Sequence, residues 1–144
     1  MGSIHLGVLH PARLAERGLL NAAFTADEQK AILTTAVTNE DNPDNGNDGG
    51  NDTSDKVFLL SIAEAKRLFV SDEERWALIT PYAAWHGAIS DLDGFGWWWL
   101  RSPGLATNLP AIVDLDGSVY FCVDFVNFNI IVTRPALYVN LDSD

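Results

Sequence analysis

One stretch of this 144-residue chain lacks five residue types altogether. Lys, Glu, Gln, Met and Trp supply 16 of the 144 residues, yet none of them occurs between Ser102 and Arg134. At the overall frequency, about four would be expected among those 33 residues. β-strands avoid Lys and Glu, so a strand-rich segment explains part of the gap. The alternative is that the codons of this segment are restricted, as they would be in a surface built to vary.

Cysteine and long apolar runs are also scarce. Cys122 is the only cysteine, which excludes an internal disulfide and a thiolate-rich metal site. No apolar run reaches the roughly 18 residues of a membrane-spanning helix, so we expect no membrane insertion. The first 18 residues lack the basic start and apolar centre of a signal peptide, so we expect no export signal. Display on a cell or phage surface is left open.

Basic residues are few: nine against twenty acidic ones, for a formal net charge of −11. Phosphate backbones and anionic lipids repel such a chain, so nucleic acid is not an expected partner. The length and the hydrophobic fraction of 47% suit one globular domain over residues 1–144.

The N-terminal half carries the start signals of short helices. A capping box, in which a Ser or Thr and a Glu three residues later satisfy each other's backbone amides, occurs three times. The boxes are Thr25 to Glu28, Ser61 to Glu64 and Ser71 to Glu74. After the first box, apolar residues continue at helical spacing as far as Val37. Thr80-Pro81 predicts a further short helix that ends before Gly87.

Between the first two boxes, residues 39–55 (NEDNPDNGNDGGNDTSD) are almost free of apolar side chains. The oxygen-rich composition suggests a calcium loop, but the EF-hand register that puts Gly46 sixth puts Pro43 at a ligand position. Asx-type turns explain the same composition without a metal. We therefore expect a solvated, self-hydrogen-bonded loop, no bound metal and no cofactor.

The C-terminal half is expected to form strands, after a short buried strand at Val57 to Leu60. Asp116-Gly117 marks a hairpin, and a three-residue loop, Leu115 to Gly117 with a left-handed glycine, gives a consistent core face. That face carries Ala111, Val113, Val119, Phe121 and Val123, and the outward face carries Ile112, Asp114, Ser118, Tyr120 and Cys122. Residues 125–132 alternate as a further strand, with Val126, Phe128 and Ile130 on one face. Short helices followed by a small antiparallel sheet indicate an α+β domain.

Two anchors frame the strand-rich region: WWWLRSPG (97–104) and RPALYVNL (134–141), with DGSV (116–119) between them. With the upstream pieces LLNAAFTADEQKAIL (19–33) and NDGGNDTSDKVFLLSIAEAKRLF (47–69), they resemble a bacterial family of domains of unknown function. Members of that family often serve as variable proteins of diversity-generating retroelements. The resemblance covers nearly the whole chain from Leu19 onward.

In such systems a reverse transcriptase that mutates adenines converts Asn codons of the form AAY into NNY codons. NNY codons cannot encode Lys, Glu, Gln, Met or Trp, the five types missing here. The resemblance thus implies that residues 94–141 form a hypervariable, ligand-binding region. Asn108, Asn127 and Asn129 would be unmutated or re-formed template positions.

The resemblance further implies a C-type-lectin-like fold, related to the formylglycine-generating-enzyme class. The implied scaffold residues are Trp97, Trp98, Trp99, Arg101, Arg134 and Leu137, with at least one of the three adjacent tryptophan rings in the core. The implied ligand-contact residues are Leu105, Asn108, Leu109, Ile112, Asp114, Leu115, Tyr120, Phe121, Cys122, Asp124, Phe125, Asn127, Phe128, Asn129, Ile130 and Ile131.

Three points stand against a simple transfer of the family pattern. The hairpin parity places Phe121 in the core, whereas the family pattern places it on the binding surface. Val123 stands where the family often has glycine, so the following turn is expected to differ. The family also carries more sequence before its LNAAF-like segment, which leaves N-terminal truncation open.

These observations favour a non-enzymatic module that binds a protein or another surface ligand. Catalysis is disfavoured, because His5, His10 and His86 are the only histidines and Cys122 has no basic neighbour in the sequence to activate it. The related formylglycine-generating enzymes use a cysteine pair, which this chain cannot supply. A static carbohydrate- or calcium-binding lectin-like module is the alternative, although the Glu-Pro-Asn and Trp-Asn-Asp triplets of sugar-binding lectins are absent.

Overall fold

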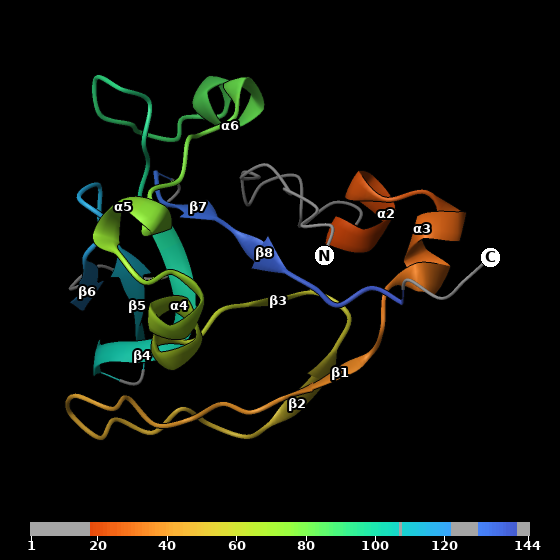
Figure 1. Ribbon diagram of the computed structural model, residues 1–144, viewed down its shortest axis with the longest axis horizontal. Coiled ribbons are helices and arrows are strands. Elements are labelled where there is room, and N and C mark those ends of the chain that lie inside the picture. The colour runs from red at the N-terminus through yellow and green to blue at the C-terminus, as the bar shows by residue number, and fades with distance from the viewer. Residues whose placement is uncertain (1–17, 107, 122–129, 141–144) are drawn as a thin grey trace.

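The computed structural model describes residues 18–106, 108–121 and 130–140 (Figure 1). Its helices are α2 (Leu19–Ala23), α3 (Ala26–Ala31), α4 (Ile62–Leu68), α5 (Asp72–Arg75) and α6 (Pro81–Trp85). Its strands are β1 (Thr35–Val37), β2 (Thr53–Asp55), β3 (Phe58–Leu59), β4 (Trp98–Ala106), β5 (Leu109–Val113), β6 (Val119–Phe121), β7 (Val132–Thr133) and β8 (Pro135–Ala136). Short helices with antiparallel sheets form an α+β architecture, which confirms the predicted class.

The largest sheet has the strand order β6-β5-β4-β7. The pairs β4–β5 and β5–β6 are antiparallel, as predicted. The prediction was wrong for β7, which lies parallel to β4 with Trp98 opposite Val132. The reason is that β7 follows β6 in the chain and not β4, so no tight turn sets its direction relative to β4.

The helix predicted from the first capping box is shorter than the apolar spacing suggested. It ends at Ala31, and residues Thr35–Val37 form β1, which pairs with β2. Beyond the helix, the backbone amide of Leu33 donates to Tyr138 O at 2.9 Å, so the chain is already held by the C-terminal segment. Four of the five residues from Thr34 to Thr38 are β-branched, which favours a strand over continued helix.

The predicted capping boxes at Thr25 and Ser61 are both present with their two reciprocal bonds. The box at Ser71 is only half formed. Ser71 accepts from the Glu74 amide, but the Glu74 carboxylate accepts from the Val70 amide and not from that of Ser71. The fourth start signal is confirmed, because Thr80 caps α6, Pro81 follows it, and Gly87 lies just past the end with a φ of 95°.

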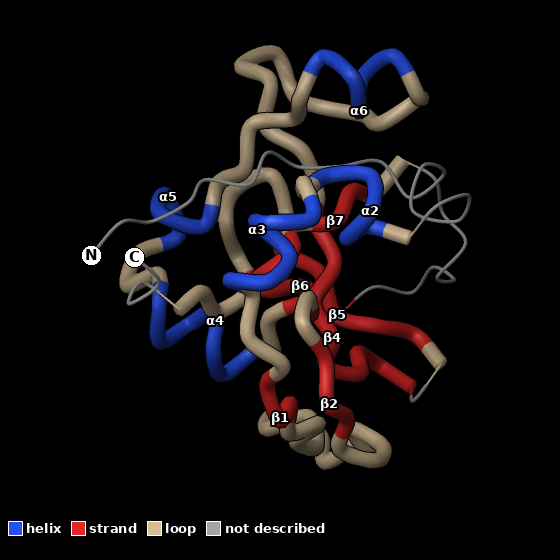
Figure 2. Tube along the Cα trace, turned by 90° about the vertical axis from the view of Figure 1, so that its right-hand side faces the viewer, coloured by secondary structure: helices blue, strands red, loops and turns tan. Residues whose placement is uncertain are grey.

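The main core lies between the four-stranded sheet and the helices α4 and α5, which pack on one side of the sheet (Figure 2). Its fully buried members include Ile62 and Ala65 from α4 and Trp98, Val113 and Val132 from the strands. A second, smaller cluster of Trp99, Ile112 and Ile131 covers the opposite face. Both faces of the central strands are therefore buried where the start of β4 pairs with the end of β5.

Two other predicted segments take more specific forms than expected. Of residues 57–60, only Phe58–Leu59 form a strand, which pairs with β8. The loop over residues 39–52 contains the expected Asx turns, for example Asn42 Oδ1 accepting from the Asp44 amide at 2.8 Å. It is not simply solvated, however, because Asn42 is only 1% exposed and its amide reaches β4.

Helix α6 and the turn after it project from one end of the molecule (Figure 1). A bridge between Leu78 and Phe95 closes the base of this arm. The amide of Ile89 also donates to Ile130 O at 3.2 Å, which joins the arm to the end of the predicted variable segment. Among the described residues, no helix has both the length and the apolar character needed to cross a bilayer.

Candidate ligand-binding surface

The hairpin of β4 and β5 carries four of the ten described candidate residues: Leu105, Asn108, Leu109 and Ile112. Trp97, Trp98 and Trp99 alternate faces at its start. Trp98 is fully buried in the main core, where its indole N–H donates to Arg75 O at 3.0 Å. Trp99 and the half-buried Trp97 belong to the second cluster. The prediction that at least one of these rings packs in the core is confirmed.

The turn between β5 and β6 follows the predicted three-residue loop. Val113 is paired with Val119, and the Asp114 amide donates to Ser118 O at 2.9 Å, which leaves Leu115, Asp116 and Gly117 as the loop. Gly117 has a φ of 82°. A Cβ on Gly117 would lie 1.9 Å from Asp72 O, so the glycine also allows α5 to approach the turn.

This register settles the position of Phe121. It pairs with Ala111 and packs against the main core, on the face that parity predicted. Ile112 and Tyr120 lie opposite each other on the other face. Tyr120 is 49% exposed, but Ile112 is 4% exposed because the second cluster covers it.

The described candidate residues fall into three states of exposure. Leu105, Asn108 and Tyr120 are exposed. Leu109, Asp114, Leu115, Phe121 and Ile130 are half-buried. Ile112 and Ile131 are buried, and in this arrangement they fill the second cluster and not a free surface. Cys122, Asp124, Phe125, Asn127, Phe128 and Asn129, together with Val123 and Val126, lie outside the described residues.

Five of the eight exposed and half-buried candidates form two groups at opposite ends of β5. One group is the β4–β5 tip, with Leu105, Asn108 and Leu109. The other lies at the β5–β6 turn, with Asp114 and Leu115. Four residue steps of about 3.3 Å separate the ends of β5 by about 13 Å, so the two groups are neighbours on one sheet and do not touch. The described residues thus give an extended surface.

Asp114 is already engaged by the protein itself. One carboxylate oxygen accepts from the Trp97 indole N–H at 2.7 Å and from the Leu115 amide at 2.6 Å. These bonds tie the turn to the start of β4. Any contact that Asp114 makes with a ligand would therefore come from an oriented carboxylate.

Arg101 joins the sheet to the helical half, as the predicted scaffold role requires. Its guanidinium donates to Leu59 O at 2.8 Å and to Thr38 O at 2.9 Å, and it forms an ion pair with Glu64. Burial opposes the charge on Glu64, but hydrogen bonds from Arg101 and from the Ser61 amide outweigh it, so the pKa of Glu64 is lowered. The same carboxylate thus caps α4 and holds β4.

Arg134 fills its predicted scaffold role through the rings of the core. Its guanidinium carbon lies 4.4 Å from the centroid of the Phe69 ring and 5.2 Å from that of Trp98. Burial lowers the pKa of Arg134 from its ordinary value. This geometry is that of a cation–π contact beneath the sheet.

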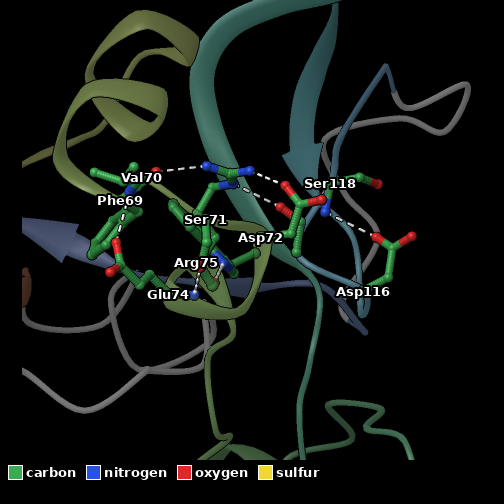
Figure 3. A network of polar contacts seen from close by, with 10 residues as sticks. Phe69, Val70, Ser71, Asp72, Glu74, Arg75, Asp116 and Ser118 are labelled. Atoms are coloured by element: carbon green, nitrogen blue, oxygen red, sulfur yellow. Dashed lines mark hydrogen bonds and ion pairs between the residues drawn. The ribbon is translucent and has the colours of Figure 1, made fainter.

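Arg75 is a scaffold residue that the sequence reasoning missed. Only 7% exposed, it donates to Gly117 O at 2.7 Å and to Phe69 O at 2.6 Å, and it pairs with Asp72. Figure 3 shows its guanidinium between Phe69 and Asp72. Its own carbonyl accepts from Trp98. Arg75 therefore fixes α5, the β5–β6 turn and β4 relative to one another.

Little in the sequence distinguished Arg75 from a surface helix residue. It ends the run SDEER, whose acids suggest a solvated helix. The apolar run from Trp76 to Ile79 follows directly, but nothing in it marks Arg75 as buried. His86 lies at the C-cap of α6, the helix predicted to end before Gly87, and its ring is 4.3 Å from that of Tyr82.

Within the described ranges, no group of three or more His, Cys, Asp or Glu side chains is arranged to hold a metal ion. The arrangement offers instead exposed apolar and polar side chains on a sheet, with buried arginines and tryptophans behind it.

Comparison with known proteins gives a family and no characterised relative. Neither a curated protein nor a solved structure matches the chain. One family model, described as a domain of unknown function (DUF6273), matches residues 16–141. That range includes the two tryptophan and arginine anchors, the capped helices and the whole sheet described above. The chain belongs to the DUF6273 family.

Proposed function

We propose that this domain is a non-enzymatic binding module for a protein or another surface ligand, and that a diversity-generating retroelement diversifies its C-terminal region. The observation that carries the proposal is the gap in residue types between Ser102 and Arg134. That gap includes Leu105 and Tyr120, which are exposed on strands, and Asn108, which is exposed in the turn between β4 and β5. A codon restriction that generates variation is useful at positions whose side chains are exposed.

The chemistry of the exposed positions supports a macromolecular ligand. Leu105 and Tyr120 are about half exposed, at 54% and 49%. Aromatic and aliphatic side chains of this kind supply most of the free energy of protein–protein contacts, and neighbouring polar groups fix orientation. The half-buried Asp114 carboxylate, oriented by Trp97, is suited to the second task.

We further propose that the scaffold is C-type-lectin-like. Short capped helices ahead of a small sheet support this, as do the buried Trp98 and the half-buried Arg101 and Arg134 behind the variable strands. An experimental structure compared with C-type-lectin domains tests the assignment, and a different strand connectivity would overturn it.

The binding surface can be tested without knowing the natural ligand. In one displayed library, NNY codons randomise Leu105, Asn108, Leu109 and Tyr120, and selection is for binding to purified lysozyme as a model target. A matched library randomises four exposed residues of α4: Ala63, Lys66, Arg67 and Leu68. Binders are expected from the first library. Equal recovery from both would contradict the assignment of the surface.

The origin of the variation is tested in the DNA around the gene. We expect a reverse-transcriptase gene nearby and a near-copy of the segment for residues 94–141 that differs only at adenines. Their absence would leave a static binding domain, for which a lectin-like role is the next candidate. Thermal shifts with simple sugars, with and without a chelator, would then test that role.

A further inference from the structure

We propose that the loop over residues 39–52 is a bracket that fixes the β4–β5 tip through three asparagine side chains: Asn42, Asn45 and Asn47. In this arrangement the tip keeps its position whatever side chains it carries. The importance of the bracket for binding rests on the function proposed above. The claim that the loop fixes the position of the tip rests on the contacts between them alone.

The asparagine amides converge on two carbonyls of β4. The Nδ2 of Asn42 donates to Pro103 O at 2.7 Å, and it lies 3.5 Å from Gly104 O. The Nδ2 atoms of Asn45 and Asn47 donate to Gly104 O at 2.9 and 2.8 Å. Three side chains of one loop thus meet β4 immediately before Leu105.

These carbonyls need partners because the strand pairing is poor at this point. Pro103 lies opposite Pro110, and neither residue has an N–H to donate across the hairpin. The register also shifts on both sides of Pro103. Unpaired carbonyls in a buried strand are costly, so donors from outside the hairpin replace the missing ladder bonds.

Gly104 fits the same interpretation. A Cβ at this position would lie 2.7 Å from Leu109 O and 3.0 Å from Pro110 O. The glycine therefore allows β4 and β5 to approach closely where regular pairing fails. Its carbonyl is then the acceptor to which Asn45 and Asn47 of the loop donate.

Amide side chains suit this task and carboxylates do not. Asn42 accepts through Oδ1 from the Asp44 amide at 2.8 Å, and Asn45 accepts from the Asn47 amide at 3.0 Å. Each of these two side chains thus turns its oxygen to its own loop and its nitrogen to β4. Aspartate at the same positions would face the β4 carbonyls with an acceptor.

The loop is itself pre-ordered, which a bracket requires. The backbone N–H of Asn42 donates to the backbone carbonyl of Asn47 at 2.8 Å, and the backbone N–H of Gly46 donates to the backbone carbonyl of Asn42 at the same distance. Lys66 of α4 lies 3.7 Å from the Asp44 carboxylate and adds an exposed ion pair. The contacts that hold the tip therefore come from outside residues 102–134, the segment in which variation is proposed.

The test uses Asn45→Asp and Asn47→Asp in the full chain, each compared with Asn51→Asp. Asn51 is exposed in the same loop and contributes its backbone carbonyl, not its side chain, to Asn39. By NMR, the amides of Ala106 and Leu109 at the tip should exchange about tenfold faster in the first two variants, since a local hydrogen bond is lost. Val113 at the other end of β5 should be unchanged, as should all three amides in Asn51→Asp.

A second measurement asks whether the bracket makes the tip tolerant of change. Leu105→Ser is made in the native chain and in Asn47→Asp, and exchange at Ala106 is compared. We expect no effect in the native chain and a clear acceleration in the variant. Unchanged exchange at the tip in Asn45→Asp and Asn47→Asp, or an equal effect of Leu105→Ser in both backgrounds, would overturn the bracket.

The two proposals fail separately. A library that yields lysozyme binders while exchange stays unchanged would retain the binding surface and reject the bracket. Faster exchange with no binders from the library would do the reverse.

Discussion

The two ends of the β4–β5 hairpin are held in different ways. The root, where β4 begins and β5 ends, is held by buried side chains, whereas the tip is held through its backbone carbonyl groups. At the root, Trp98 pairs with Val113, and both are fully buried. At the tip, Leu105 is 54% exposed while the carbonyl beside it accepts from asparagines of the loop. The root thus depends on which residues it contains. The tip depends on residues elsewhere, so its own side chains are free to change.

The largest effect is expected from a change at the root. Trp98→Ala should lower the free energy of unfolding by about 3–5 kcal/mol, because it leaves a cavity and removes the donor to Arg75 O. Urea denaturation measures the loss. Trp85→Ala is the matched control, since Trp85 is 82% exposed, and it should change stability by less than about 0.5 kcal/mol. Similar losses in the two variants would contradict the assignment of Trp98 to the core.

The β5–β6 turn gives the second prediction. Gly117→Ala should cost more than the roughly 1–2 kcal/mol of a left-handed backbone, since the added Cβ also collides with Asp72 O of α5. Gly46→Ala is the control: its φ of 73° is similar, but a Cβ there meets nothing within 4 Å. Thermal denaturation of both variants separates collision from backbone strain. Equal losses would mean that α5 does not press on the turn.

These contrasts show what local patterns could predict. The caps at Thr25 and Ser61 and the turn at Gly117 depend on a few adjacent residues, and the sequence was sufficient to predict them. Arg75 and Asn42 act across 42 and 61 residues, on Gly117 and Pro103. No rule of sequence spacing relates residues so far apart, so the sequence around Arg75 and Asn42 did not indicate these roles. The parallel pairing of β7 with β4 was not predicted for the same reason.

The candidate surface shows the same limit. Parity correctly placed Phe121 on the core face, because alternation is local. It also placed Ile112 outward, and that is the face on which Ile112 lies. Burial of that face depends on Trp99, which is paired with Ile112 from β4, and on Ile131, which lies just before β7 further along the chain. Alternation gives the face of a residue, and the rest of the fold decides its exposure.

The third prediction concerns the link between β4 and α4, midway between root and tip. The pKa of Glu64 is lower in the folded protein than in the unfolded chain, so its ion pair with Arg101 contributes stability above the unfolded pKa of about 4.3. That contribution is lost as the pH falls through the lower, folded pKa. In Glu64→Gln, the acid-induced loss of stability should therefore be smaller, as urea titrations at pH 6 and pH 3.5 would measure. An identical pH dependence in both proteins would exclude the pair as a pH-sensitive link.

The smallest effect is expected at the tip, and it tests the comparison most directly. Leu105→Ser should change the free energy of unfolding by less than about 0.5 kcal/mol, since the side chain is half exposed and the backbone beside it is held by the loop. The same substitution at Leu100, which is 1% exposed in the same strand, should cost several times more, because it places a hydroxyl in the core. Urea denaturation of the two variants gives the ratio. Near-equal costs would mean that the tip relies on its own side chains, and a surface of that kind could not vary freely.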